Sequence, residues 1–138
     1  MKIAIIASTF YQKIADEMVE ITQKQLHAHQ YDTEVFTVIG AYDVPTALSM
    51  VIDSSKFDGA VCLGCVIKGE TDHFHYVCNE ASSGIGSLAR SFQFPVGFGI
   101  ITANSKFQVE GRVAKVATNA CMACIDLVKI KLSVERDD

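Results

Sequence analysis

Short apolar runs alternate along this chain with longer segments in which apolar residues recur every three or four positions. The short runs, which predict strands, cover residues 3–7, 35–38, 59–65 and 95–101. The longer segments, which predict helices, cover residues 13–29, 45–52, 74–88 and 109–130. Pro45 stands where the second of these helices can begin, since proline suits a first helical turn.

The order of these segments predicts the fold. Strands that are apolar at consecutive positions are buried on both faces, as in a parallel sheet covered by helices on each side. We therefore expect an α/β protein, a flavodoxin-like three-layer αβα sandwich with a four-stranded parallel sheet. At 138 residues the chain fits one domain, covering residues 1–138.

Composition narrows the class of partner. Hydrophobic residues make up 49% of the chain and mean hydropathy is +0.24, which is high for a small monomer and favours buried subunit interfaces. The net charge is −4 and the basic residues are scattered, so a nucleic-acid partner is not expected.

Two features that the sequence does not contain bear on the cellular location of the protein. The first apolar run is too short for a signal peptide, and no segment approaches membrane-spanning length, so we expect a cytoplasmic protein without a membrane partner. Five cysteines, an odd number, are expected to be reduced thiols.

Ligands of open parallel sheets bind outside the carboxyl ends of the strands, which directs attention to the segments that follow each strand. These segments are Ser8 to Tyr11, Gly40 to Asp43, Gly64 to His73, and Thr102 to Asn104.

The third segment carries the strongest local signal. Gly64 and Gly69 allow close approach of backbone to a ligand, and Thr71 or Asp72 can cap the helix that follows. A glycine loop before a helix N-terminus favours an anion such as phosphate. His73, in the first turn, then stands beside that anion as a general acid or base, because imidazole titrates near neutral pH. An ordinary βα turn with a solvated histidine fits the same local pattern equally well.

Three further residue types suit a small organic ligand. Phe10 and Tyr42 follow neighbouring strands and can stack on a flat heterocycle, while Asp43 can accept hydrogen bonds from polyol hydroxyls. Arg112, early in the last predicted helix, can clamp a phosphate. Taken one at a time, the rings fit packing and the arginine fits a solvated surface.

The cysteines and histidines do not predict a metal site. Cys62 and Cys65 lie three apart in a strand and therefore point to opposite faces. Cys121 and Cys124 share a helical face and suit small core positions. The histidine two positions after His73 diverges from it on a helix, and no third ligand is evident.

The run from Leu63 to Glu80, LGCVIKGETDHFHYVCNE, is similar nearly position by position to the most characteristic segment of lumazine synthases. The resemblance continues in residues 40–45 and 95–102 and at Arg112 and Asn119, and it spans the chain from about Lys2 to Val128. It implies a transferase of riboflavin biosynthesis that condenses 5-amino-6-(D-ribitylamino)uracil with 3,4-dihydroxy-2-butanone 4-phosphate. The products are 6,7-dimethyl-8-ribityllumazine and phosphate, and no cofactor or metal is needed.

The resemblance also implies roles for individual residues. His73 transfers protons. The substrate-binding residues are Phe10 on the uracil ring; Ala41, Tyr42 and Asp43 along the ribityl chain; Cys65, Val66 and Ile67 beside the pyrimidine through their backbone; Glu70 and Thr71 at the phosphate; and Phe98 and Arg112 from a neighbouring subunit.

Such a shared site implies a homo-oligomer, a pentamer or a multiple of pentamers. Because the chain starts at its first predicted strand, we expect a bare pentamer. The chain departs from the usual family pattern at several positions, namely Thr9 for Arg, Tyr11 for Asn, Asp43 for Glu, Gly111 for an acidic residue and Val116 for Lys. Two other functions remain open: an archaeal-type riboflavin synthase of the same fold, and a non-catalytic lumazine- or flavin-binding module.

Overall fold

A four-stranded parallel sheet forms the middle layer of the computed structural model, which describes residues 1–69 and 73–136. The strands are β1 (Lys2–Ser8), β2 (Asp32–Val38), β3 (Gly59–Ile67) and β4 (Val96–Ala103), and their order in the sheet is β2-β1-β3-β4. All neighbouring pairs are parallel, as the apolar runs predict.

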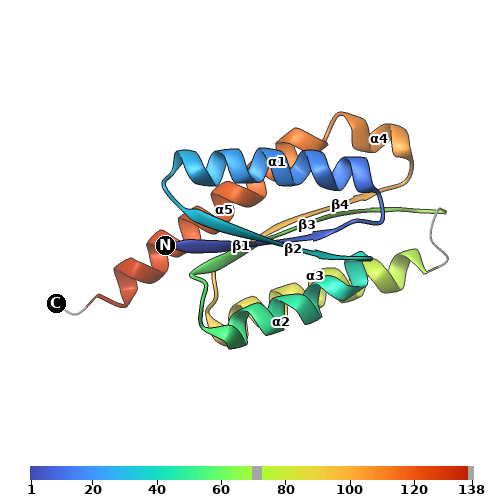
Figure 1. Cartoon of the computed structure of the whole chain (residues 1–138). Helices are drawn as coiled ribbons and strands as arrows, with labels where there is room; N and C mark the ends of the chain where they lie inside the picture. Colours follow the sequence, from blue (N-terminus) through green and yellow to red (C-terminus); the bar gives the residue numbers. More distant parts are fainter. Residues whose placement is uncertain (70–72, 137–138) are drawn as a thin grey trace.

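Helices cover both faces of this sheet (Figure 1). One face carries α1 (Gln12–Ala28), α4 (Lys106–Glu110) and α5 (Val113–Val134), and the other carries α2 (Val44–Ser54) and α3 (Phe74–Phe92). A short 3-10 turn, η1 (Ala41–Asp43), leads into α2. The predicted flavodoxin-like three-layer sandwich is therefore confirmed.

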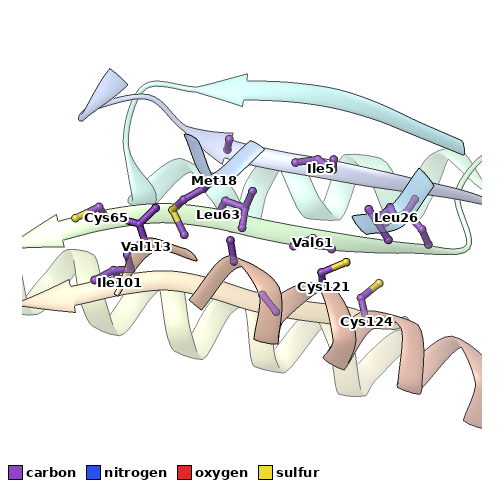
Figure 2. Packing of buried hydrophobic residues seen from close by; sticks show 14 of the residues in the cluster. Ile5, Met18, Leu26, Val61, Leu63, Cys65, Ile101, Val113, Cys121 and Cys124 are labelled. Carbon is purple, nitrogen blue, oxygen red and sulfur yellow. The ribbon is translucent and has the colours of Figure 1, made fainter. Parts of the chain in front are cut away.

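Each face of the sheet has its own apolar core. Along β3, Val61, Leu63 and Cys65 point into the core beneath α1 and α5 (Figure 2). The alternate residues Cys62 and Val66 point into the core beneath α2 and α3. This alternation confirms that Cys62 and Cys65 lie on opposite faces.

Helix α5 approaches the sheet closely at one glycine of β4. A Cβ atom built at Gly97 would lie 1.9 Å from the carbonyl oxygen of Ala120, so only a residue without a side chain fits there. Cys121 and Cys124, one turn apart on the same face of α5, are fully buried beside this contact (Figure 2). Their prediction as small core residues is confirmed.

Several elements run a few residues longer than predicted, and two differ in a way that has a clear physical reason. The helix predicted over residues 109–130 is broken into α4 and α5, with Gly111 and Arg112 between them. Strand β2 starts at Asp32 rather than at residue 35, because it is an edge strand whose first residues are polar. Pro45 does stand in the first turn of α2, as predicted.

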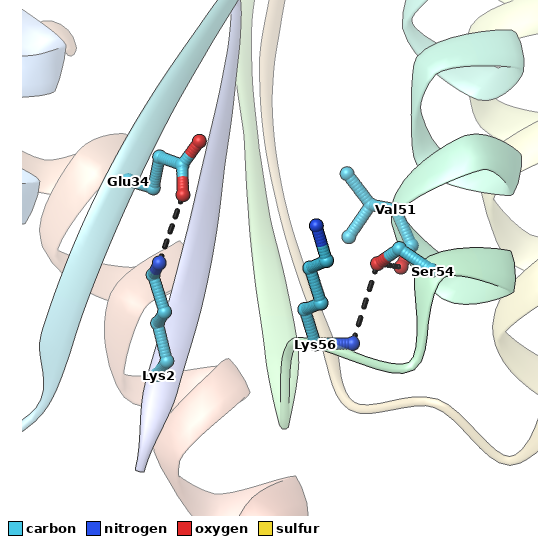
Figure 3. A network of polar contacts seen from close by, with 5 residues as sticks. All are labelled: Lys2, Glu34, Val51, Ser54 and Lys56. Carbon is cyan, nitrogen blue, oxygen red and sulfur yellow. Dashed lines mark hydrogen bonds and ion pairs between the residues drawn. The ribbon is translucent and has the colours of Figure 1, made fainter.

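Polar contacts fix the amino edge of the sheet (Figure 3). The Lys2 ammonium on β1 forms an ion pair of 2.8 Å with Glu34 on β2. At the end of α2, the Ser54 hydroxyl donates to the Val51 carbonyl at 2.7 Å and accepts from the Lys56 N–H at 3.3 Å. The two Ser54 hydrogen bonds stabilise the connection between α2 and β3.

None of the helices within residues 1–69 and 73–136 is both long and apolar enough to cross a membrane.

Candidate active site

The carboxyl ends of β1 and β2 are joined where the candidate ligand-binding segments begin. The Thr9 N–H and hydroxyl both donate to the Val38 carbonyl, at 2.8 and 3.2 Å. These bonds place Phe10 beside the segment that follows β2. The two aromatic residues, Phe10 after β1 and Tyr42 after β2, therefore both lie at the carboxyl end of the sheet.

At the carboxyl end of the sheet, strand β3 extends further than β1 does. The pairing of β1 with β3 ends at Ala7 and Leu63, whereas β3 continues to pair with β4 as far as Ile67 and Ala103. The backbone of residues 65–67 is therefore flanked by β4 on one side and by the space beyond the end of β1 on the other. The strand order reverses between β1 and β3, which is where open α/β sheets bind ligands.

The side chains of Cys65, Val66 and Ile67 are buried in the two cores. A ligand at this position would therefore meet their backbone and not their side chains. This agrees with the predicted backbone role of the three residues.

Exposed aromatic rings stand at the ends of β1 and β2. Phe10 is 53% exposed and packs edge-to-face on Tyr11, with ring centroids 5.0 Å apart. Tyr42 is 54% exposed, whereas its neighbour Ala41 is buried in the core beneath α2 and α3. Two half-exposed rings on otherwise well-packed segments are available for stacking.

Asp43 closes the turn that presents Tyr42. Its carboxylate Oδ2 accepts from the Gly40 N–H at 3.2 Å, and its own N–H donates to the Gly40 carbonyl at 3.0 Å. One carboxylate oxygen is thus engaged within the turn, a contact that the sequence did not predict.

His73 is the residue immediately before α3 rather than part of its first turn, because its backbone is not helical (φ −126°, ψ 44°). Its carbonyl accepts from the Val77 N–H at 2.9 Å, which is the first turn of hydrogen bonding in α3. The imidazole is exposed and lies edge-to-face with the Tyr76 ring, at 6.1 Å between centroids.

His73 and Tyr42 line the same hollow, whose volume is about 840 Å³. His73, just before α3, and the turn after β2 therefore face one another. The other residues of this hollow come from one face of α3 and were not predicted as site residues: Tyr76, Val77, Asn79, Glu80 and Ser83. Their helical spacing was the available signal, because residues three, four and seven apart share a face.

Phe98 and Arg112 lie on the β4 side of the molecule, apart from this hollow. Phe98 is 44% exposed on an edge strand, and the Arg112 guanidinium donates to the Thr102 carbonyl at 3.2 Å. Arg112 and Thr102 line a second hollow of about 500 Å³, together with Phe74. The structure therefore separates the predicted residues into two groups, with His73 in one and Arg112 in the other.

Two predicted phosphate ligands, Glu70 and Thr71, lie outside the described residues, as does the predicted capping residue Asp72. Their roles stay predictions.

The thiols are set up for packing and not for ligation or nucleophilic attack. Burial raises the pKa of Cys121 to about 11 and that of Cys124 to about 12. The pKa of Cys62 is raised further by complete burial. Within the part of the chain that the structure describes, no three His, Cys, Asp or Glu side chains gather as a metal site would require.

These features define a class: a flavodoxin-like α/β protein with a hollow at the carboxyl end of its sheet, lined by the rings of Tyr42 and Tyr76 and by the exposed His73. The sequence profile of the 6,7-dimethyl-8-ribityllumazine synthase family matches residues 1–131. The chain belongs to this family.

Individual relatives agree over nearly the whole length. The chain is 34% identical to the 6,7-dimethyl-8-ribityllumazine synthase of Ruthia magnifica, over 97% of this chain and 87% of that protein. It is 31% identical to the enzyme of the same name from Cupriavidus metallidurans, over 98% and 82% of the two chains. With the Campylobacter hominis enzyme of that name the identity is 38%, over 86% and 78%.

Proposed function

We propose that this chain is a 6,7-dimethyl-8-ribityllumazine synthase. It condenses 5-amino-6-(D-ribitylamino)uracil with 3,4-dihydroxy-2-butanone 4-phosphate and releases phosphate. The observation that carries the proposal is that the family match coincides with an exposed histidine and an exposed aromatic ring in one hollow, between the turn after β2 and helix α3. In this proposal the chain folds as a single domain and is a cytoplasmic enzyme of riboflavin biosynthesis.

The ribitylaminouracil is assigned to the ends of β1, β2 and β3. Phe10 stacks on the pyrimidine, whose edge meets the backbone of residues 65–67. Tyr42 and the backbone of Ala41 flank the ribityl chain, and Asp43 borders it in the same turn. The half-exposed rings and the projecting end of β3 support this assignment.

The phosphate of the second substrate is assigned to the loop that contains Glu70 and Thr71, ahead of α3. Backbone N–H groups at a helix N-terminus favour an anion there. His73, at the start of the same helix, is then placed to move protons beside the reacting carbonyl.

Each step of the reaction needs only proton transfers from the protein. The 5-amino group condenses with the ketone carbonyl and releases water, phosphate is then eliminated, and the ribitylamino nitrogen closes the ring on the second carbonyl with release of a second water. One histidine beside two substrates held together is a sufficient catalytic group, and holding them together contributes much of the rate. No metal or organic cofactor enters these steps.

The second group of residues is assigned to a neighbouring copy of the chain. Phe98 and Arg112 are exposed on the β4 side and do not line the His73 hollow, and in this assignment they cover the ring system and the phosphate of an adjacent subunit. Exposed apolar side chains elsewhere on the surface, such as Ile130 and Val134, also favour burial between copies. The proposed assembly is a homopentamer, or a multiple of pentamers.

The test is to incubate the protein with both substrates and to follow lumazine fluorescence together with phosphate release. Replacing His73 by Ala is expected to lower kcat by about 100-fold, the lower end of general acid–base contributions, without affecting assembly. His75→Ala, which removes an exposed imidazole that does not line the hollow, is the matched control. Wild-type turnover in His73→Ala would remove its proton-transfer role, and a well-folded oligomer that forms no product would exclude the enzyme.

A further inference from the structure

We propose that Asp43 is a positioning residue: its carboxylate closes the turn after β2 and thereby fixes the exposed ring of Tyr42 over the His73 hollow. The consequence for substrate binding rests on the proposed function, whereas the turn itself is a property of the chain alone.

The turn is held by two hydrogen bonds that run in opposite directions between the same two residues. The Gly40 N–H donates to the Asp43 carboxylate at 3.2 Å, and the Asp43 N–H donates to the Gly40 carbonyl at 3.0 Å. The first bond is the acidic half of a capping box, in which an acidic residue reaches back to the residue three positions before it, and the second is the backbone bond that closes the 3-10 turn. Both ends of the turn are therefore fixed.

Between these ends, Ala41 and Tyr42 point in opposite directions. Ala41 is 3% exposed and packs in the core beneath α2 and α3, so the inner side of the turn is anchored. Tyr42, the next residue, is directed outward and lines the hollow that also contains His73. With both ends closed and Ala41 anchored, the backbone leaves little freedom to the position of the Tyr42 ring.

The Asp43 carboxylate serves the turn and not the helix that it precedes. Asp43 is the residue before α2, yet its side chain makes no capping hydrogen bond to that helix. Its carboxylate accepts instead from the N–H of Gly40, on the opposite side of Tyr42. The position therefore calls for a hydrogen-bond acceptor of this length and not for a negative charge as such.

Loss of the acceptor leaves the Gly40 N–H without its partner and lets the turn open. The Tyr42 ring then populates several orientations, and ordering it against the bound ribityl chain opposes binding. His73 lies on a different segment, ahead of α3, so the chemical step keeps its geometry. We therefore expect an effect on KM and not on kcat.

The experiment compares Asp43→Ala, Asp43→Asn, Tyr42→Ala and the double variant Tyr42→Ala/Asp43→Ala. Asp43→Ala is expected to raise KM for the ribitylaminouracil about tenfold, the loss of one charge-assisted hydrogen bond, with kcat within about twofold of wild type. Asp43→Asn keeps an acceptor oxygen and is expected to restore KM to within about threefold of wild type. The double variant is expected to be no worse than Tyr42→Ala alone, because one residue acts through the other.

A second measurement does not depend on activity. In the protein without substrate, amide hydrogen exchange of the segment 39–44 is expected to be at least about tenfold faster in Asp43→Ala and near wild type in Asp43→Asn. Asp43→Ser, which has a polar side chain too short to reach Gly40, should exchange like Asp43→Ala and guards against misfolding of one variant.

The proposal is overturned if exchange is unchanged in Asp43→Ala, if Asp43→Asn binds as poorly as Asp43→Ala, or if the two single effects add in the double variant. The last two results would indicate a direct charged contact with substrate. A wild-type protein that forms no lumazine would defeat the proposed function, and the exchange measurement would still decide the role of Asp43 in the turn.

Discussion

Helices α5 and α3 cover opposite faces of the sheet and are used in different ways. Along the 22 residues of α5, seven side chains are buried, whereas along the 19 residues of α3 only Ala81 and Ile85 are buried. Helix α5 touches the sheet directly at Gly97, while α3 leaves a hollow of about 840 Å³ beside it. One helix completes the core, and the other keeps most of its surface for other contacts.

The difference separates stability from function in space. Residues beneath α5 are fixed by close packing, and any change in their volume must be absorbed by the sheet. Residues on the open side of α3, such as His73 and Tyr76, have few neighbours to disturb. Substitutions on the α5 face should therefore reduce stability, and substitutions on the α3 face should change activity or little else.

The largest effect is expected for Gly97→Ala. The new Cβ would overlap the Ala120 carbonyl, which belongs to helix backbone and cannot move without shifting α5. We expect a loss of about 3 kcal/mol or more in the free energy of unfolding, measured by urea denaturation.

Gly86→Ala is the matched control on α3. A Cβ there meets the end of the flexible Arg90 side chain at 3.1 Å, so this substitution is expected to be neutral or to stabilise by up to about 1 kcal/mol through helix propensity. Equal losses at Gly97 and Gly86 would show that the two faces do not differ in the way described.

A smaller effect is expected from alkaline pH, through the thiols beneath α5. The pKa of Cys121 is raised from 9.0 to about 11 and that of Cys124 to about 12, so the folded state holds these protons more tightly than the unfolded state does. Below pH 9 both thiols are protonated in the folded and unfolded states, and their contribution to the free energy of unfolding is complete. Above pH 9 the unfolded state loses these protons first, so the free energy of unfolding falls by about 1.4 kcal/mol per pH unit for each thiol until its folded pKa is reached.

Urea denaturation at pH 8, 9 and 10 measures this slope. The variant Cys121→Ala/Cys124→Ala is expected to lose stability less steeply between pH 9 and 10 than wild type. Cys78→Ala, on α3, removes a thiol whose pKa burial raises less, and should leave most of the slope in place. A double variant with an unchanged slope would contradict the role assigned to the two thiols.

The smallest effect is expected for the ion pair between Lys2 and Glu34, on the α2 and α3 side of the sheet. Both side chains are more than 40% exposed, so solvent screens the pair. A double-mutant cycle with Lys2→Ala and Glu34→Ala should give a coupling of about 0.5 kcal/mol or less, which 1 M salt removes. A coupling of several kcal/mol that persists in salt would show that this side is less solvated than its exposure indicates.

The fold was predictable because the central strands are apolar without interruption. Residues 59–65 are buried on both faces, and that is the pattern that fixes a parallel sheet between helices. The break between α4 and α5 was not predictable from spacing, since Val109 and Val113 are both buried and lie four apart as in a continuous helix. Hydrophobic periodicity reports which side chains face the core and not whether the backbone between them is helical.

The candidate site was predictable only in part. The position of His73 and the rings at Phe10 and Tyr42 follows from the rule that ligands bind at the carboxyl ends of strands. The bond between Asp43 and Gly40 does not follow, because the same carboxylate suits a ligand, a helix cap or a turn, and only coordinates distinguish these. The separation of Arg112 from His73 likewise depends on three-dimensional placement.

Because most of the thiols are buried, the chain can be labelled selectively at one native cysteine. Cys62, Cys65, Cys121 and Cys124 are buried, and Cys78, in the second turn of α3, is partly accessible. Alkylation requires both access and thiolate formation, so a maleimide dye should attach at Cys78 well before the other positions. A fluorescent or spin-labelled reporter can thus be placed near His73 without engineering a new cysteine or removing an old one.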